Sequence, residues 1–280
     1  MDAVILLNKP AGMTSFDAVA KCRRIFHERK IGHTGTLDPE ASGLMIILLG
    51  KYTKLLPYCV KNHKAYQATL KLGEMTDTED IWGTIINTKT PSIHTEAEID
   101  NAVQSLTGDI LQVPPMYSAL KKDGKKLYEY ARQGIEIERE ARPVHISTLE
   151  VEKIDETNYR MNAVVSSGTY IRTLITDFGK QLDELAIMSS LIRTKIEHLS
   201  LKDACTFKDL ESGVSFLSPI QVIDPTYKIV ETDRVVDIKN GKRIKLDIQD
   251  SRVIFTSKGE LLAAYALQED GLYHCLRGLF

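Results

Sequence analysis

Residues 31–50 read Ile-Gly-His-Thr-Gly-Thr-Leu-Asp-Pro-Glu-Ala-Ser-Gly-Leu-Met-Ile-Ile-Leu-Leu-Gly. Asp38 precedes a proline, which moves its backbone out of the helical region toward an extended or turn conformation. Glycines on both sides allow positive φ values or a close approach of a ligand. The apolar run 44–49 predicts a buried strand behind this loop. The pattern predicts a reactive carboxylate on a stiffened loop, and the alternative is an ordinary Asp-Pro turn between two elements.

Length and composition indicate an ordinary globular chain. At 280 residues it exceeds the usual single domain of about 100–200 residues, so we expect one large and one small domain. The 43% hydrophobic and 26% charged residues, without repeats or low-complexity tracts, argue against disorder. The first apolar run, residues 3–7, is too short for a signal sequence or a membrane span. We therefore expect a cytoplasmic protein without membrane contact.

The cysteines and histidines indicate no metal centre. The four cysteines are far apart without a Cys-x-x-Cys pair, which predicts reduced, unligated thiols, and the seven histidines are equally dispersed. The acids of segment 74–80 are of the type that binds magnesium, but a solvated polar loop is the simpler interpretation.

The positive charge is local. The net charge is −2, but residues 1–70 contain ten Lys and Arg against five Asp and Glu. Basic runs occupy residues 21–30, 51–64 and 121–132. Such runs are often only solvated surface. If all three flank the Asp38 loop in the fold, they predict a phosphate-bearing partner on that side.

Hydrophobic periodicity predicts alternating strands and helices. We expect strands at 3–7, 44–49, 64–73, 82–88, 135–154 and 159–166. We expect helices from an N-cap at Ser15 to about Arg29, behind a capping box at Thr95–Glu98, over 125–133, and from Gly168 through four turns to Leu185. Residues 228–280 predict short strands of a small β domain after a linker between Pro219 and Pro225.

Two side chains in these elements are chemically notable. Arg172 lies in the first turn of its predicted helix, where a cation opposes the helix dipole, so we expect an anion nearby unless the side chain is simply exposed. Tyr66 occupies an inward position of the strand 64–73, where it is either a core residue or a ring that stacks on a nucleobase.

Four motifs in order carry a family resemblance. They are Gly-His-Thr-Gly-Thr-Leu-Asp-Pro at 32–39, Tyr66, Pro-Pro-Met-Tyr-Ser-Ala-Leu-Lys at 114–121, and Ser-Gly-Thr-Tyr-Ile-Arg-Thr-Leu at 167–174. With them the chain resembles the bacterial tRNA pseudouridine synthase B family over residues 3–225 and, more weakly, beyond. The resemblance implies an α+β fold with a mixed, largely antiparallel sheet flanked by helices. It also implies a catalytic domain over 1–225 and a PUA-like RNA-binding β domain over 226–280.

The resemblance also implies an activity. The expected enzyme isomerises uridine 55 in the T-loop of tRNA to pseudouridine without a cofactor or metal, as a monomer and without a guide RNA. Asp38 would be the catalytic carboxylate and Arg172 its ion-pair partner. Tyr66 would be the aromatic ring stacked on the target base and a proton-transfer group, and so a third catalytic residue. Whether Asp38 acts as a nucleophile or as a base at the sugar is left open by the sequence.

Four further residues would bind the substrate. His33 would fill the space that the extruded uridine leaves, and Leu191 would pack on the base opposite the tyrosine. Asp80 would position polar groups near the base, and Lys9 would be a structural or RNA-proximal lysine near the cleft.

Some residues depart from the family pattern, and two other functions compete with the first. Trp82 stands where a small or acidic residue is more usual, and Glu197-His198 stands where a glycine is more usual. The guide-RNA-dependent relative of archaea and eukaryotes shares the Asp-Pro loop, although Lys121–Gly134 resembles the stand-alone bacterial branch. From another class, the chain could act chiefly as a tRNA-binding or folding factor.

Overall fold

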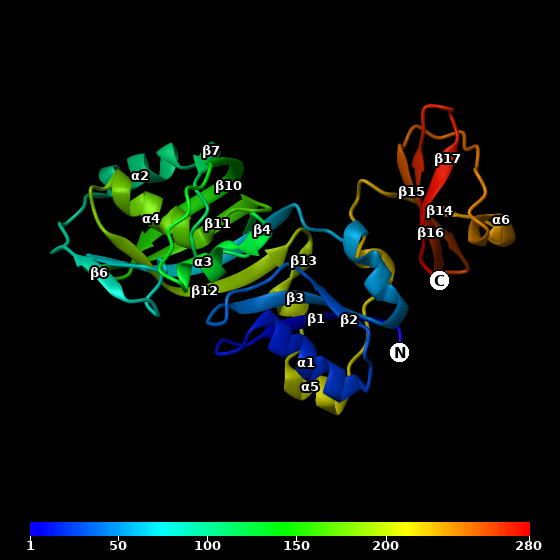
Figure 1. Ribbon diagram of the computed structural model, residues 1–280, viewed down its shortest axis with the longest axis horizontal. Coiled ribbons are helices and arrows are strands. Elements are labelled where there is room, and N and C mark those ends of the chain that lie inside the picture. Colours follow the sequence, from blue (N-terminus) through cyan, green and yellow to red (C-terminus); the bar gives the residue numbers. More distant parts are fainter. The chain divides into compact units, whose positions relative to one another are not determined.

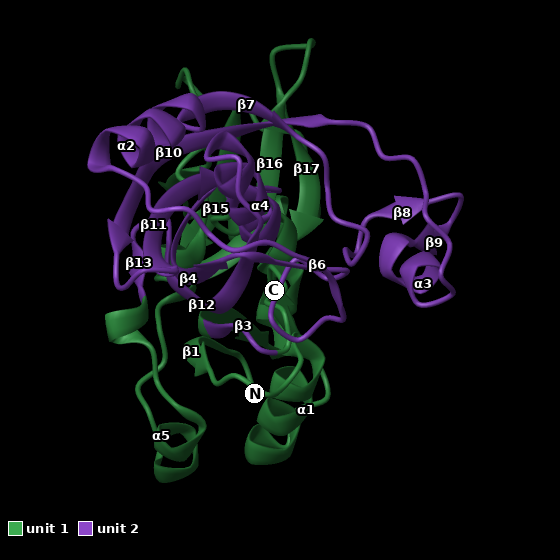
Figure 2. Ribbon diagram, turned by 90° about the vertical axis from the view of Figure 1, so that its left-hand side faces the viewer, with its two compact units in different colours: residues 1–39, 43–61, 201–280 green, residues 40–42, 62–200 purple.

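A computed structural model describes residues 1–280 (Figure 1). The chain divides into two compact units (Figure 2): residues 1–39, 43–61 and 201–280 form unit 1, and residues 40–42 and 62–200 form unit 2. No helix combines the length and the apolar character needed to cross a membrane.

The N-terminal part of unit 1 is built on the predicted apolar run. β3 (Ser42–Leu49) pairs antiparallel with β1 (Ala3–Lys9) and with β2 (Ile31–Thr34). All six residues from Leu44 to Leu49 are fully buried, which confirms the strand predicted there. The remaining elements of this part are helical: α1 (Ser15–Phe26), η1 (Gly50–Tyr58), η2 (Leu201–Asp203), α5 (Phe207–Ser212) and η3 (Pro219–Val222).

The start of α1 differs from the prediction. Its N-cap is Thr14, whose hydroxyl accepts from the Asp17 backbone N–H at 3.0 Å, while the Asp17 carboxylate accepts from the Thr14 backbone N–H. Ser15 is the first helical residue, so the prediction of Ser15 as the cap is wrong by one position. The helix also ends at Phe26 rather than about Arg29, because His27 adopts a left-handed conformation with φ 51°.

The C-terminal strands of unit 1 form a sheet of their own. β14 (Lys228–Glu231) pairs parallel with β15 (Arg252–Ser257), and β16 (Glu260–Leu267) and β17 (Tyr273–Gly278) continue the sheet antiparallel. Together with α6 (Val235–Lys239) they enclose a separate apolar core that includes Phe255, Tyr265 and Tyr273. The small β fold predicted for 228–280 is therefore present, and a domain boundary at residue 225 stays a prediction.

Unit 2 is an antiparallel sheet covered by helices. Its strand order is β12 (Ala186–Ile196), β4 (His63–Leu72), β11 (Asn158–Ser166), β10 (Arg142–Lys153) and β7 (Gly108–Gln112), and β13 (Leu199–Ser200) pairs with β12. The helices α2 (Glu96–Ser105) and α4 (Ile171–Gln181) contact each other, and they pack on β10 and β12 respectively (Figure 1).

Two small hairpins extend from this sheet. β5 (Glu74–Thr76) pairs with β6 (Ile85–Thr88), and β8 (Lys121–Lys122) pairs with β9 (Lys125–Lys126) just before α3 (Leu127–Ala131). In Figure 2 the segment with β8, β9 and α3 stands apart from the sheet of unit 2. The mixed, largely antiparallel α+β fold predicted from the sequence is thereby confirmed.

The structure corrects four element boundaries in unit 2. The helix predicted to run to Leu185 ends at Gln181, because Leu182 caps it and Asp183 turns left-handed with φ 54°, and the unpredicted strand β12 follows. Part of the predicted loop 74–80 is strand β5. The strands predicted from Trp82 and from residue 135 begin only at Ile85 and Arg142.

Candidate active site

A buried lysine anchors the Asp38 loop in unit 1. Lys9 has no exposed surface, and its ammonium donates to the carbonyls of Pro10 at 2.8 Å, Met13 at 2.7 Å and Pro39 at 3.1 Å. A buried ammonium requires such partners, since an unpaired buried charge is costly. Lys9 thus ties the end of β1 to the residue that directly follows Asp38.

A buried serine anchors the other side of the same loop. The Ser15 hydroxyl accepts from the Leu37 backbone N–H at 2.9 Å and donates to the Leu37 carbonyl at 3.1 Å. Leu37 itself is buried, while Asp38 between these two anchors is half-buried. The hydroxyl predicted to cap α1 therefore holds the loop instead, and Asp38 lies in a loop, as the sequence predicts.

His33 precedes this loop on β2. It pairs with Ile47 of the buried strand β3, and its side chain is half-buried. The neighbouring Gly32 has no room for a side chain, because a Cβ there would meet Leu56 Cδ1 at 2.8 Å. Close packing between β2 and η1 thus fixes the strand that carries His33.

Arg172 is buried in unit 2, so the exposed alternative considered for it is wrong. Only 5% of the residue is exposed. Its guanidinium donates from Nη1 to the Thr78 carbonyl at 2.8 Å and from Nη2 to the Tyr117 carbonyl at 2.9 Å. Because carbonyls are neutral, these bonds orient the guanidinium without cancelling its charge. The arginine therefore joins two loops to the first turn of α4.

The start of α4 is held by a side chain from β7. The Gln112 carboxamide donates to the Tyr170 carbonyl at 3.1 Å and accepts from the Tyr170 backbone N–H at 2.8 Å. Tyr170 is the N-cap of α4 and makes no side-chain cap bond of its own. The position of Arg172 is thus set by the helix start as well as by its hydrogen bonds to Thr78 and Tyr117.

Asp80 organises a tight turn beside Arg172. Its Oδ1 accepts from the Thr78 hydroxyl at 2.6 Å and from the Trp82 backbone N–H at 3.1 Å. Such Asx-type bonds are a usual role of aspartate in turns.

Across the chain, no cluster of three or more His, Cys, Asp or Glu side chains is arranged to hold a metal ion.

Tyr66 and Leu191 lie on one face of the unit 2 sheet. Tyr66 of β4 is opposite Arg193 of β12, and Leu191 is opposite Ala68. Residues two apart on a strand point to the same face, so the tyrosine and the leucine occupy adjacent rows of that face. Tyr66 is half-buried and Leu191 is 7% exposed.

Two charged residues of this region were not predicted from the sequence. Arg193, opposite Tyr66, is only 1% exposed. Glu79 has a left-handed backbone with φ 65°, and its carboxylate accepts from the Thr173 hydroxyl at 2.8 Å, next to Arg172 in sequence. Burial raises the pKa of the Glu79 carboxyl above its usual value. Only the charges themselves, at otherwise structural positions, could have drawn attention to these residues.

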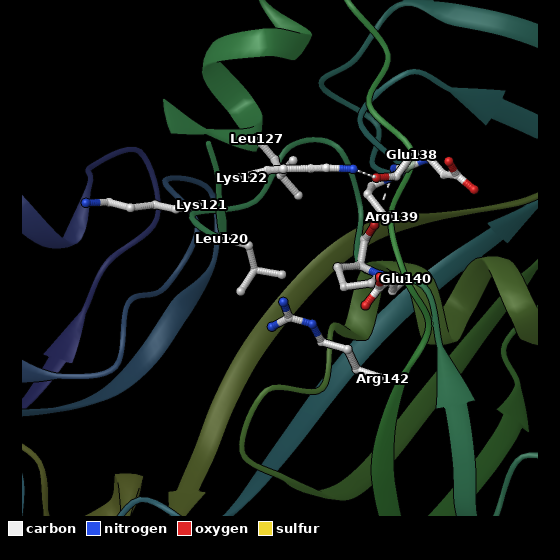
Figure 3. A pocket seen from close by; sticks show the side chains of 9 residues that line it. Leu120, Lys121, Lys122, Leu127, Glu138, Arg139, Glu140 and Arg142 are labelled. Carbon is white, nitrogen blue, oxygen red and sulfur yellow. Dashed lines mark hydrogen bonds between the residues drawn. The ribbon is translucent and has the colours of Figure 1, made fainter. Parts of the chain in front are cut away.

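A cavity of about 220 Å³ lies elsewhere in unit 2, between the β8–β9 hairpin and the start of β10 (Figure 3). Leu120, Leu127 and Pro114 form its apolar part. Lys122 donates to the Glu138 carbonyl at 2.8 Å, and the guanidinium of Arg142 points into the hollow. The cavity therefore combines apolar surface with basic groups.

Two of the four thiols are buried and resist ionisation. All four cysteines are unpaired, which confirms the prediction of free thiols. Burial raises the pKa of both Cys22 and Cys59 to about 12, so neither forms a thiolate near neutral pH.

The seven predicted site residues fall into two groups. Lys9, His33 and Asp38 belong to unit 1. The second group belongs to unit 2 and comprises Tyr66, Asp80, Arg172 and Leu191. In unit 1 Lys9 holds the loop of Asp38, and His33 lies on the strand before that loop. In unit 2 Arg172 binds the turn that Asp80 shapes, and Tyr66 and Leu191 share one face of the sheet.

Comparison with known proteins gives consistent matches. Residues 23–171 match the family model described as "TruB family pseudouridylate synthase (N terminal domain)". A relative from Oceanobacillus iheyensis named "tRNA pseudouridine synthase B" is 40% identical, with 95% of this chain and 92% of the relative covered. Relatives of the same name from Geobacillus thermodenitrificans and Streptococcus sanguinis are 42% and 40% identical, covering 95% and 96% of this chain and 94% and 97% of theirs.

Solved structures share the fold at lower identity. One chain from the "Crystal Structure of a Cbf5-Nop10-Gar1 Complex" has a TM-score of 0.71 and 24% identity, with 99% of this chain and 85% of that chain covered. A chain from "Structure of H/ACA RNP bound to a substrate RNA containing 2'-deoxyuridine" has a TM-score of 0.70 and 22% identity, with 99% and 84% covered. At this identity the likeness concerns the fold alone.

Proposed function

The chain belongs to the TruB family of pseudouridylate synthases, and from this premise we propose that it converts uridine 55 in the T-loop of tRNA into pseudouridine. The family is one of isomerases, so the chain is an enzyme whose substrate and product contain the same atoms. The name shared by the relatives, tRNA pseudouridine synthase B, supports tRNA as the substrate. The position of the uridine rests on the resemblance of the sequence motifs.

The reaction requires one bond to replace another without oxidation. The N1–C1′ bond of the uridine breaks, a C5–C1′ bond forms, and the proton on C5 is lost while N1 becomes protonated. A carboxylate can assist either as a nucleophile or as a base at the sugar. We assign this role to Asp38, without a nicotinamide, flavin or metal in the chemistry.

The observation that carries the proposal is the double anchoring of the Asp38 loop. Lys9 holds Pro39 and Ser15 holds Leu37, so both neighbours of the carboxylate are fixed by buried side chains. Fixing a reacting group before the substrate arrives reduces the entropy that the reaction has to remove. An ordinary surface turn would not require a fully buried lysine to hold it.

We propose that Arg172 is the ion-pair partner of Asp38. Support comes from its burial and from its place in the first turn of α4, where a cation opposes the helix dipole and favours an anion nearby. A planar guanidinium suits a carboxylate because it can donate two parallel hydrogen bonds.

The other residues would hold the extruded base and the RNA. Tyr66 would stack on the target uracil and Leu191 would pack on the opposite side, while His33 would fill the gap left in the T-loop. Asp80 would act through the turn that it shapes. Taking a base out of its stack costs a few kcal/mol, and phosphate contacts from the basic runs would offset this cost.

We propose that the enzyme acts without a guide RNA, as a monomer. The curated relatives, at 40–42% identity over nearly the full chain, are named as tRNA enzymes. The solved structures titled as Cbf5 and H/ACA complexes share the fold at 22–24% identity. The guide-dependent reading therefore has weaker support than the stand-alone one.

The test is a reaction on an unmodified tRNA transcript with purified protein alone. We expect pseudouridine at position 55 and at no other uridine, mapped by chemical labelling and primer extension. A transcript with cytidine at position 55 is the matched control and should give no product. No product from the uridine transcript, or product only after a guide RNA is added, would contradict the proposal.

A further inference from the structure

Trp82 is the only tryptophan of the chain, and it lies on the surface of unit 2. It is 48% exposed, and the adjacent Ile81 is 44% exposed. Ile85 and Ile86, which open the strand β6 (labelled in Figure 1), are 55% and 60% exposed. Segment 81–86 therefore exposes several large apolar side chains. Such a concentration indicates an interaction surface rather than an isolated exposed side chain.

The turn that presents Trp82 is rigid. Asp80 Oδ1 accepts from the Trp82 backbone N–H at 3.1 Å, and Asp77 Oδ1 accepts from the Thr84 backbone N–H at 2.7 Å. Gly83 is enclosed, because a Cβ there would meet Thr78 Oγ1 at 2.2 Å. A side chain on a preformed backbone loses little entropy on binding, so this turn suits recognition.

The same turn is attached to the proposed site. The Thr78 carbonyl accepts from Arg172 at 2.8 Å. On the other side, the Ile81 backbone N–H donates to the Met188 carbonyl at 3.0 Å, which ties the turn to β12. Leu191 lies three residues further along that strand. Trp82 is therefore displayed on a segment held directly by two elements that carry proposed substrate-binding residues.

The charges around Trp82 favour a nucleobase over a phosphate. The turn carries Asp77 and Asp80, and these carboxylates disfavour a close approach of the RNA backbone. A nucleobase has a neutral π-face, and every base can stack on an indole ring. The flat, uncharged indole ring matches the base and not the sugar-phosphate chain.

We propose that the Trp82 indole is a stacking platform for a nucleobase of the RNA substrate other than the target uridine. This inference rests on the proposed function and adds to it a second base-binding position.

The single tryptophan makes the contact directly measurable. The probe is an unmodified T-arm stem-loop RNA titrated into the full-length protein while tryptophan emission is recorded. We expect saturable quenching, because a stacked base quenches indole fluorescence. Stem-loops with one abasic site at each loop position in turn should bind with the quenching lost at one position. Quenching that is absent, or that is the same with every abasic RNA, would overturn the inference.

Substitutions of Trp82 test whether its ring stacks on a base or contributes to RNA binding in another way. Trp82→Ala should weaken binding of the stem-loop about tenfold, and Trp82→Phe, which keeps a ring, should recover most of it. The loss should be the same at low and high salt, since no phosphate contact is removed. Ile93→Ala, at a residue 83% exposed outside the turn, is the matched control and should bind like wild type.

The result is independent of the catalytic proposal. Pseudouridine formation by the wild-type protein is measured on the same stem-loop, so a lack of product would count against the proposed function alone. Product formation together with wild-type affinity of Trp82→Ala would overturn only the stacking inference. The exposed apolar group would then be better explained as a surface for a protein partner.

Discussion

The single buried charge of Lys9 fixes the conformation of the Asp38 loop. It donates to three carbonyls from separate positions, so its removal takes a charged donor away from each of them. We expect Lys9→Met to lower the free energy of unfolding by about 3 kcal/mol, because a hydrogen bond from a charged group contributes about 1.5–3 kcal/mol. Urea unfolding would measure this. Lys61→Met, at an exposed lysine, is the control, and equal stability of the two variants would show that the three bonds contribute nothing.

The buried carboxyl of Glu79 predicts how the stability of the protein depends on pH. Burial raises the pKa of its carboxyl, so over some pH range above the usual glutamate pKa the folded protein keeps a proton that the unfolded chain has lost. This contribution to stability is present at low pH and disappears as the pH rises through the folded pKa. Glu79→Gln keeps an acceptor for Thr173 but cannot titrate. We therefore expect the stability of the variant relative to wild type to increase with pH.

Unfolding by urea at a series of pH values from 4 to 8 would check this. Glu150→Gln, at an exposed glutamate of β10, is the control and should follow the wild-type pH dependence. If the Glu79→Gln profile is also parallel to wild type, the burial of this carboxyl does not contribute to stability in the way described.

At the scale of single residues, the sequence predicts which side chains can react better than it predicts their burial and their hydrogen-bond partners. The Asp-Pro dipeptide between glycines was sufficient to predict that Asp38 lies in a loop. The sequence also predicted a positive charge, Arg172, in the first turn of a helix. It could not predict that Arg172 is buried, because its partners, the carbonyls of Thr78 and Tyr117, are distant in sequence. The role of Ser15 was missed for the same reason, since Leu37 is its partner.

At the scale of elements, β12 shows where periodicity is insufficient. Leu182 and Leu185 continue the apolar spacing of α4, and Leu182 is buried, so the pattern extends the helix past its true end. The chain leaves the helix because Asp183 adopts a left-handed conformation, which the spacing of apolar residues does not encode. The apolar residues of β12 do not alternate with polar ones, so a period of two is absent from its sequence.

At the junction between α4 and β12, close packing predicts the opposite effect of a glycine-to-alanine substitution from the effect that helix propensity predicts. Replacing a helical glycine by alanine normally stabilises a helix by about 1 kcal/mol. At Gly179, however, a Cβ would meet Ala186 Cβ at 2.6 Å and the Glu184 carbonyl at 2.9 Å. We expect Gly179→Ala to lower the free energy of unfolding by about 1–3 kcal/mol through overpacking. Thermal or urea unfolding would show it, with Gln181→Ala at the exposed end of α4 as control. A stabilised Gly179→Ala would refute close packing there.

At the scale of the whole molecule, the distribution of charge matters more than its sum. The net charge of −2 alone would argue against an RNA-binding protein. The basic runs are the better indication, yet part of them is used within the protein. Lys21 lies 3.9 Å from Glu211, and Lys54 donates to the Phe280 carbonyl at 2.5 Å. A basic run in sequence therefore overestimates the number of cations that remain for phosphates.

The family and the fold were predictable at this scale because four motifs occur in order over most of the chain. The distribution of the site residues over two units was not, since it depends on which distant segments associate. Lys9, His33 and Asp38 are local to one unit, and Tyr66 and Arg172 to the other. The central claim is that the carboxylate of Asp38 performs the isomerisation of the uridine.

The most direct test compares wild type and Asp38→Asn on one unmodified tRNA transcript. Single-turnover formation of pseudouridine at position 55 is measured together with the dissociation constant of each complex. The account predicts product from wild type and none from Asp38→Asn, with the affinity of the variant within about tenfold, or ~1.4 kcal/mol, of wild type. Pseudouridine formed by Asp38→Asn would contradict it.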